Sequence, residues 1–281
     1  MEIRYLTQKE KTASRLLYEE VFVEDEKAFV DAYYEIKAAD NQILAAVETG
    51  NILAMLHRNP YTFRLRGKCV RADYLVAVAT RRQFRHQGLM RSLLTRTLQD
   101  MEQEQQPFAF LMPADEAIYL PFDFRLMGNE DEEGLAALSE KELSEEYDLY
   151  IEKDEDYERR HISWPEWETT PMMMRPVYLP ALVERIGAKE EQRLVIAISD
   201  PILSENQGTF LWKFTTEGSS LVPTEEIPEV EISIADLGSF LCGMLGAEEL
   251  PGMERTENRL GLLEKLNRIC VLEGIYINET V

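Results

Sequence analysis

A strand–turn–helix–strand pattern between residues 74 and 112 constrains the fold of this chain more than any other feature. The apolar run at residues 74–80 predicts a buried strand, a short basic turn follows it, and Gly88 then opens a helix. Leucine and methionine recur at helical spacing to about residue 105, and Pro107 ends the helix before a second apolar run at residues 108–112. Because two strands joined through a helix lie parallel in one sheet, the pattern predicts an α/β fold with a ligand in the splay between those strands.

The turn before Gly88 has the properties of a phosphate-binding loop. The first amides of a helix have no partner inside the helix, and the helix dipole is positive at that end. Gly88 lets the backbone approach a phosphate closely because it has no Cβ atom. Five arginines add positive charge to the segment: Arg81, Arg82, Arg85, Arg91 and Arg96. The spacing alone is equally typical of an ordinary strand–helix connection with solvated arginines, since a single glycine after a strand is a weak motif.

Length and charge limit the classes of protein to which the chain can belong. With 281 residues it exceeds a typical single domain, so two domains are expected. Its 52 acidic and 30 basic residues give a net charge of −22, which argues against nucleic-acid and anionic-membrane partners. The same charge favours cationic partners such as amines, or serves solubility alone.

Cysteine and histidine are sparse in the sequence. The three cysteines are widely spaced and odd in number, which indicates a reducing compartment without a disulfide framework. No Cys-x-x-Cys pair occurs and the three histidines are scattered, so no metal site is expected. The charged N-terminus has no apolar signal core, and no apolar run reaches the length of a membrane span. The sequence therefore predicts a cytoplasmic protein without membrane contact.

The chain divides into an N-terminal α/β domain (residues 1–129), an acidic connecting segment (130–170) and a smaller α+β domain (171–281). Residues 130–158 hold 14 acidic side chains against two lysines, which is typical of a solvated connection; a binding surface for a basic partner is the alternative. Residues 172–175 are expected to form the first strand of the second domain. The apolar run at residues 269–277 is expected to form its terminal strand.

Two motifs resemble those of the GCN5-related N-acetyltransferase (GNAT) superfamily. Residues 85–90, Arg-His-Gln-Gly-Leu-Met, are similar to its Arg/Gln-x-x-Gly-x-Gly/Ala pyrophosphate loop, with Met90 where a small residue is usual. Residues 118–124 are similar to its Ile-Tyr-x-x-Phe-Gly-Phe/Tyr element, with Tyr119 at the tyrosine position and Asp123 in place of glycine. Because Asp123 replaces the glycine, the sequence does not predict the backbone conformation of that bend.

The chain as a whole resembles the enhanced-intracellular-survival (Eis)-like branch, whose members end in a sterol-carrier-like domain. The segments that carry this resemblance are residues 18–22, 76–94, 118–119, 174–182, 198–200, 206–210, 234–237 and 277–281. Larger members have a second acetyltransferase-like domain between the two, and here the acidic segment replaces it. The resemblance implies a GNAT fold, which is a mixed sheet with splayed parallel strands at the cofactor site, followed by a smaller α+β sterol-carrier-like domain.

The resemblance also implies acetyl transfer from acetyl-CoA to an amine by direct attack in a ternary complex, without a metal. The acceptor stays open among aminoglycoside-like compounds, polyamines and other small-molecule amines, lysine side chains and N-terminal amines, and so does the oligomeric state. One alternative is a catalytically silent, regulatory protein that binds acyl-CoA. The other is a hydrophobic-ligand carrier built on the C-terminal domain.

For the reaction, the resemblance implies Tyr119 as the general acid that protonates the leaving CoA thiolate, and the α-carboxylate of Val281 as the base. A packed core tyrosine and a frayed terminus are the structural alternatives, and Glu24, Asp25, Asp123 or water could be the base instead. A backbone N–H near residues 78–80, where the strand should bulge, is the expected oxyanion donor. The expected cofactor-binding residues are Val78, Ala79, Thr80, Arg85, His86, Gln87, Gly88, Leu89 and Met90.

Overall fold

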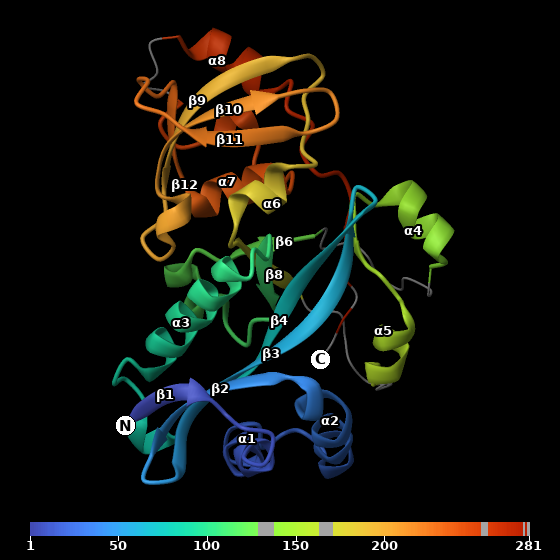
Figure 1. Cartoon of the computed structure of the whole chain (residues 1–281), viewed down its shortest axis with the longest axis vertical. Coiled ribbons are helices and arrows are strands. Elements are labelled where there is room, and N and C mark those ends of the chain that lie inside the picture. The colour runs from blue at the N-terminus through green and yellow to red at the C-terminus, as the bar shows by residue number, and fades with distance from the viewer. Residues whose placement is uncertain (129–137, 163–170, 254–257, 278, 280–281) are drawn as a thin grey trace.

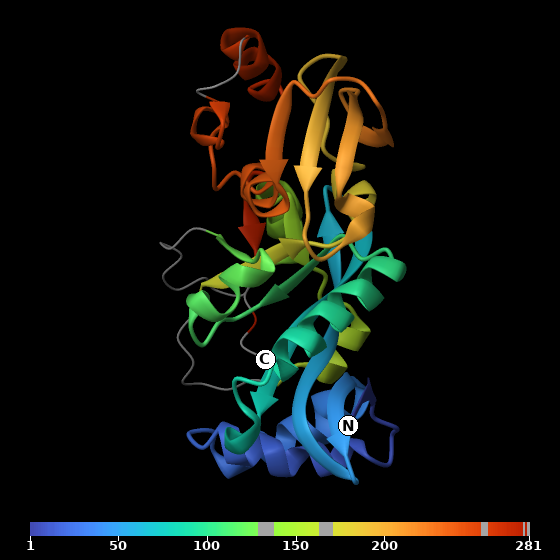
Figure 2. The same cartoon turned by 90° about the vertical axis from the view of Figure 1, so that its left-hand side faces the viewer.

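The chain folds into two β-sheets that lie one beyond the other along the long axis of the molecule, each with its own helices (Figures 1 and 2). The computed structural model describes residues 1–128, 138–162, 171–253, 258–277 and 279. The larger sheet has nine strands and the smaller one has four. The expected α/β fold with a mixed sheet, followed by a smaller α+β domain, is confirmed.

The main path of the larger sheet runs in the order β1-β2-β3-β4-β5-β8-β6. Of its neighbouring strands, β4 and β5 are parallel and the others are antiparallel. At the far end of β3 the sheet continues through β7, which pairs in parallel with β13. The bounds are β1 (Glu2–Tyr5), β2 (Gln42–Glu48), β3 (Asn51–Leu65), β4 (Lys68–Thr80), β5 (Phe108–Leu111), β6 (Arg125–Met127), β7 (Leu149–Ile151), β8 (Met172–Pro176) and β13 (Ile275–Tyr276).

Helices cover both faces of the larger sheet. α1 (Arg15–Val21) and α2 (Lys27–Asp40) pack on one face, and α3 (Leu89–Gln103) packs on the other. Because side chains alternate along a strand, Ile43 of β2 packs in the core with α1 and α2, whereas its neighbour Leu44 packs in the core under α3. Burial on both faces explains why the inner strands read as nearly continuous apolar runs.

The smaller sheet has the order β11-β10-β9-β12, and the buried Trp212 lies in its core. Its strands are β9 (Gln192–Ser199), β10 (Gly208–Phe214), β11 (Ser219–Pro223) and β12 (Val230–Ser233). The helices of this part are α6 (Leu179–Val183), α7 (Ile234–Leu241) and α8 (Arg259–Leu266). Two further helices, α4 (Glu140–Glu146) and α5 (Glu155–Arg160), flank β7 in the acidic segment.

Three strands differ from the sequence-based expectation. Residues 172–175, expected at the start of the second domain, lie in β8, which pairs with β5 and β6 inside the larger sheet. The interpretation of the acidic segment as a solvated connection is wrong for β7, whose residues are buried against β3. The terminal strand is limited to β13 and is shorter than residues 269–277. A local apolar run does not reveal which distant strand it pairs with. The domain limits at residues 130 and 171 stay predictions.

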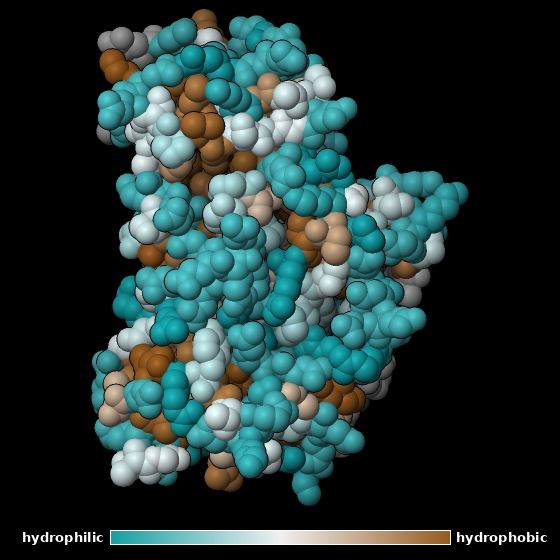
Figure 3. Space-filling model, in the orientation of Figure 1, coloured by the Kyte–Doolittle hydropathy of each residue, from teal (hydrophilic) through white to brown (hydrophobic). Residues whose placement is uncertain are grey.

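The surface seen in Figure 3 is mostly hydrophilic, with apolar areas that are small and separated by polar side chains. The sequence is rich in charged residues, and only a few large apolar side chains are exposed among the described residues, which explains this hydrophilic surface. Among the described helices, none combines the length and the apolar character that crossing a bilayer would need.

Candidate functional site

β4 and β5 pair over a short distance and then separate. Parallel pairing joins Asp73 with Ala109 and Tyr74 with Phe110, and β5 ends one residue later. β4 runs on to Thr80, so beyond Tyr74 its edge on this side has no partner in β5. An unpaired strand edge carries N–H and C=O groups that an extended ligand can bond.

A β-bulge in β4 lies on this unpaired stretch. Met55 of β3 is opposite Ala79, whereas His57 is opposite Val76, so β4 has one extra residue in the interval. Ala77 at the bulge has a positive φ of 52°. The bulge that the sequence predicts is confirmed, and it rotates backbone groups out of the regular ladder. The role of these groups as oxyanion donors stays a prediction.

The loop that follows β4 leads to the exposed N-terminus of α3. Gly88 is the N-cap residue of α3, and its φ of +79° is in the left-handed region that favours glycine. Arg85 Nε donates to Thr80 O at 3.2 Å, which holds the loop back against the end of β4. A Cβ atom at Gly88 would meet no heavy atom within 4 Å, so the space before the first turn of α3 is open. The unpartnered amides of that turn therefore face a position that an anion can reach.

The predicted loop residues differ in exposure. The four that precede α3 are exposed: Arg85, His86, Gln87 and Gly88. The other two begin α3; Leu89 is buried and Met90 is partly buried. Two of the five arginines in the segment are occupied elsewhere. Arg81 pairs with Glu20 of α1, and Arg96 pairs with Asp100. Because these two guanidinium groups are already paired with carboxylates, the positive charge open to a ligand is smaller than the sequence indicates.

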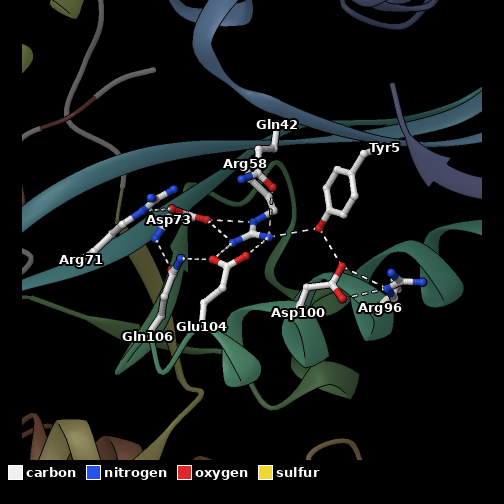
Figure 4. Close-up of polar contacts among 9 residues, drawn as sticks. All are labelled: Tyr5, Gln42, Arg58, Arg71, Asp73, Arg96, Asp100, Glu104 and Gln106. Carbon is white, nitrogen blue, oxygen red and sulfur yellow. Dashed lines mark hydrogen bonds and ion pairs between the residues drawn. The ribbon is translucent and has the colours of Figure 1, made fainter. Parts of the chain in front are cut away.

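A buried arginine fixes the other end of α3 to the sheet (Figure 4). Arg58 of β3 is 1% exposed and donates to Asp73 of β4 at 2.8 Å, to Glu104 after α3 at 2.6 Å and to Tyr5 of β1 at 3.0 Å. Gln106 closes the network, because its amide nitrogen donates to Glu104 at 2.9 Å and its oxygen accepts the Asp73 N–H at 3.0 Å. The network sets the direction in which the N-terminus of α3 points.

Tyr119 lies between two short 3₁₀ turns, η3 (Glu116–Ile118) and η4 (Leu120–Phe122). Its side chain is 7% exposed and packs on Phe124 with ring centroids 6.1 Å apart. Burial raises the pKa of Tyr119 to about 12, so the phenol keeps its proton at neutral pH. A protonated phenol can donate a hydrogen bond and can act as an acid.

The tyrosine turn contacts α3, and Tyr119 shares a buried apolar cluster with Tyr74, Phe110 and Leu89. The guanidinium of Arg91, in the first turn of α3, lies 5.0 Å from the centre of the Phe122 ring in η4. Burial, Glu279 and Tyr119 together raise the pKa of Tyr74, which stacks on Phe110 at the last paired position of β4 and β5. The splayed strands, the start of α3 and the tyrosine turn thus meet in one region.

Asp123 follows η4 with a positive φ of 64°. Aspartate tolerates the left-handed region better than most residues, so the bend forms here without the glycine found at this position in the GNAT motif. Burial raises the pKa of its carboxyl, and Oδ2 has no hydrogen-bond partner in the described structure.

The C-terminal tail reaches the face of the larger sheet that α2 covers. Glu279 is 6% exposed, accepts a hydrogen bond from the Tyr61 hydroxyl at 2.7 Å and lies 3.9 Å from Lys37 Nζ. Lys37 Nζ also donates to the Tyr61 hydroxyl at 2.6 Å. Burial lowers the pKa of Lys37 to about 8, and Glu279 opposes that shift. Val281 itself lies outside the described residues.

The cluster of Lys37, Tyr61 and Glu279 has no counterpart among the residues that sequence patterns single out. Tyr61 and Glu279 are 218 positions apart, and although Glu279 lies in the C-terminal segment that resembles the Eis-like ending, nothing in the sequence pairs it with Tyr61. Among the other carboxylates considered as a base, Asp25 accepts a hydrogen bond from Tyr18 at 2.7 Å, and Glu24 is exposed. In the part of the chain that the structure describes, no group of three or more His, Cys, Asp and Glu side chains is arranged for a metal ion.

Family models match both parts of the chain. Residues 2–127 match a model described as an acetyltransferase (GNAT) domain, and residues 179–276 match a sterol carrier protein domain. The chain is a GNAT domain joined to a sterol carrier protein domain. This combination is the one that the motifs around Gly88 and Tyr119 and the segments of the C-terminal half predict.

Several solved structures share the fold of the GNAT and sterol carrier domains together. A conserved protein from Enterococcus faecalis V583, described as a probable N-acyltransferase, is 11% identical with a TM-score of 0.75 over 99% of each chain. A GCN5-related N-acetyltransferase from Kribbella flavida is 12% identical with a TM-score of 0.72 over 100% of this chain and 98% of that one. Eis1 from Mycobacterium abscessus is 13% identical with a TM-score of 0.66 over 100% of both. At such identities the likeness shows the fold alone, and no curated protein matches the chain in sequence.

Proposed function

We propose that this protein is an N-acetyltransferase that moves the acetyl group of acetyl-CoA to an amine by direct attack in a ternary complex. The observation that carries the proposal is that three features meet in one region of the GNAT domain. These features are the unpaired, bulged edge of β4, the open N-terminus of α3 and the buried phenol of Tyr119.

Each feature fits one part of acetyl-CoA. The amides at residues 85–90 and the positive end of the α3 dipole suit the pyrophosphate, because the space before Gly88 is open. The edge of β4 that β5 leaves unpaired, at Val78, Ala79 and Thr80, suits the amide-containing pantetheine arm, which would lie along β4 like an added strand. The thioester then ends near the bulge, where a backbone N–H can donate to the carbonyl oxygen.

The reaction needs an acid and a base. The amine nitrogen forms a bond to the acetyl carbon, the carbon–sulfur bond breaks, and Tyr119 gives its proton to the departing thiolate. Tyr119 is protonated at neutral pH, as this role requires. The base takes a proton from the amine, and we assign it to the α-carboxylate of Val281. Glu279, two residues earlier, is buried on the face that α2 covers, which supports a tail directed into the site.

The acceptor is a cationic amine that binds in its small neutral fraction or loses its proton on binding. The net charge of −22 favours the approach of such a molecule. A cavity of about 220 Å³ beside the Glu279 cluster is lined by acidic and basic side chains alike, among them Asp154, Asp156, Arg71 and Arg160, so its charge does not select the acceptor. Small-molecule amines, lysine side chains and N-terminal amines all satisfy this chemistry.

Titration calorimetry with acetyl-CoA, followed by thiol release with a panel of amines, tests the proposal. We expect binding, and thiol release that depends on the amine. Tyr119→Phe should lower kcat by roughly 10²-fold or more while acetyl-CoA binding stays the same, because it removes a general acid and little else. The matched control is Tyr150→Phe, which removes the hydroxyl of a buried tyrosine on β7; among the described contacts that hydroxyl donates only to Glu140.

The outcomes separate the alternatives. Binding without thiol release from any amine would favour a regulatory acyl-CoA-binding protein and would contradict the enzyme. Absence of acetyl-CoA binding would contradict the assignment of residues 85–90. Equal activity of wild type and Tyr119→Phe would remove Tyr119 from the mechanism while leaving the enzyme in place.

A further inference from the structure

We propose that the sterol carrier protein domain orders the turn that carries Tyr119, and that Arg175 is the positioning residue that transmits this order. The inference rests on the proposed function, since Tyr119 is the acid of that reaction. It gives the C-terminal domain a role at the acetyl-transfer site rather than a separate ligand of its own.

Arg175 of β8 lies at the junction of the two domains and is 0% exposed. Its Nε donates to the carbonyl oxygen of Phe122 at 2.9 Å, and its Nη2 donates to Asp200 Oδ1 at 2.6 Å. Its Nη1 donates to Pro176 O at 2.6 Å. One side chain therefore holds the end of η4 in the GNAT domain and the end of β9 in the C-terminal domain at the same time.

The contact with Phe122 acts directly on the tyrosine turn. The Phe122 N–H donates to Tyr119 O at 2.9 Å, and the Asp123 N–H donates to Leu120 O at 3.0 Å. Phe122 thus connects Arg175 to the turn by two hydrogen bonds, one from Arg175 to its carbonyl oxygen and one from its own N–H to Tyr119. Asp123 Oδ2 lies 3.9 Å from Arg175 Nη2, so the guanidinium also faces the carboxylate at the bend.

Asp200 is a fixed anchor for this arginine. Its Oδ1 accepts the N–H groups of Ile202 and Leu203 at 3.0 and 2.9 Å, and its Oδ2 accepts from Asn206 Nδ2 at 3.0 Å. Asn206 Nδ2 also donates to Val177 O at 2.9 Å, which clamps this loop to the chain that leaves β8. The carboxylate cannot rotate without losing several hydrogen bonds, so it orients the guanidinium rather than following it.

The packing around β8 leaves the junction little freedom. A Cβ atom at Gly238 of α7 would lie 2.8 Å from Pro176 Cγ, so α7 approaches β8 as closely as a glycine allows. A buried ion pair adds little net stability, because desolvation of the two charges offsets their attraction. The planar fork of arginine supplies direction instead, with three donors fixed toward three oxygens.

The test is Arg175→Lys. Lysine keeps the positive charge beside Asp200 but has no fork, so it loses the donor to Phe122 O. We expect kcat to fall at least tenfold while the Kd for acetyl-CoA stays within about twofold, since a misplaced catalytic group lowers the rate without weakening cofactor binding. Hydrogen exchange at the Phe122 and Asp123 amides should speed up in the same variant.

A double-mutant cycle distinguishes positioning from general structural support. If Arg175 acts through Tyr119, Arg175→Lys has no further effect on kcat in the Tyr119→Phe background. The same fractional loss in both backgrounds, or an unchanged kcat in Arg175→Lys alone, would overturn the proposal. Should Arg175→Lys not fold, Gly238→Ala replaces it in the same cycle, because the added methyl group must displace α7 from Pro176.

Arg66→Lys is the matched control. Arg66 also joins the two parts of the chain, since it donates to Cys270 O at 2.9 Å and Val271 O at 2.8 Å, but it lies in the turn between β3 and β4. It should leave both kcat and the exchange of the tyrosine turn unchanged. If the wild type transfers no acetyl group to any amine, the proposed function fails, and the exchange rates at Phe122 and Asp123 alone decide whether Arg175 orders the turn.

Discussion

A charged side chain at Gly88 should block acetyl-CoA binding and leave the fold intact. The backbone there has a φ of +79°, and a Cβ atom would meet nothing within 4 Å. Any other L-residue there should therefore destabilise the fold only through its left-handed backbone conformation, by about 1–2 kcal/mol. For a protein of this size that corresponds to a fall in Tm of roughly 2–8 °C.

The loss of binding should be much larger than the loss of stability. In Gly88→Glu the carboxylate projects into the open space before α3, where the pyrophosphate is proposed to lie. Two like charges about 4 Å apart at a protein surface repel by about 4 kcal/mol, which is roughly a 10³-fold increase in Kd. In Gly88→Gln the backbone strain and the size are the same but the charge is absent, so its Kd should rise far less.

Titration calorimetry and thermal unfolding on the same samples check both parts of this prediction. Gly67, in the turn between β3 and β4, has a φ of +78° and equally open space around its Cβ position. Gly67→Glu should lower Tm by a similar amount and leave acetyl-CoA binding unchanged. Equal Kd values for Gly88→Glu and Gly88→Gln at low salt would refute the electrostatic argument, and wild-type binding by both would refute the loop assignment.

Three further predictions follow from buried or terminal groups. Arg58→Met should lower the free energy of unfolding in urea by about 3–5 kcal/mol because Asp73 stays buried; Arg96→Met, at an exposed pair, should change it by under about 0.5 kcal/mol. Asp123→Gly should stabilise the protein by about 1 kcal/mol at pH 7. Burial raises the folded-state pKa of Asp123, so the ionised carboxylate destabilises the folded protein above that pKa, and this destabilisation disappears below the unfolded-state pKa. The stability gained by Asp123→Gly should therefore narrow as pH falls toward about 4. A gain that is the same at every pH would contradict this reasoning. Adding residues after Val281 should lower kcat in the thiol-release assay by roughly tenfold or more without changing the Kd for acetyl-CoA; full activity would exclude the terminal carboxylate.

Local patterns were sufficient for the centre of the GNAT domain. The strand before Gly88, the glycine itself and the helix after it follow from apolar periodicity and from backbone geometry, which are properties of neighbouring residues. The family resemblance places a bulge near residues 78–80, and the structure has it between Val76 and Ala79. Even the bend at Asp123 forms as in the related motif, because aspartate can adopt the left-handed conformation that glycine would take.

Long-range pairing was beyond the reach of these patterns. The apolar run in β8 is compatible with either sheet, and only packing against β5 and β6 assigns it to the larger one. The three residues of β7 are buried, but they lie in a stretch whose average composition is acidic and therefore predicts exposure. The contacts of Arg175 and Glu279 join segments far apart in the chain, and a charged residue in an apolar or terminal stretch gives no sign of its partner.

The position of β8 ties the folding of the N-terminal half to a much later part of the chain. β5 pairs with β4 through two residue pairs and with β8 through four, and all of its residues are fully buried. A polypeptide cut near residue 129, or one still emerging from the ribosome, would therefore present β5 as a bare apolar edge, the kind of strand that recruits other chains. The acetyltransferase half is a separate match in sequence comparisons, but β5 gains its second neighbouring strand only after residue 176 has been made.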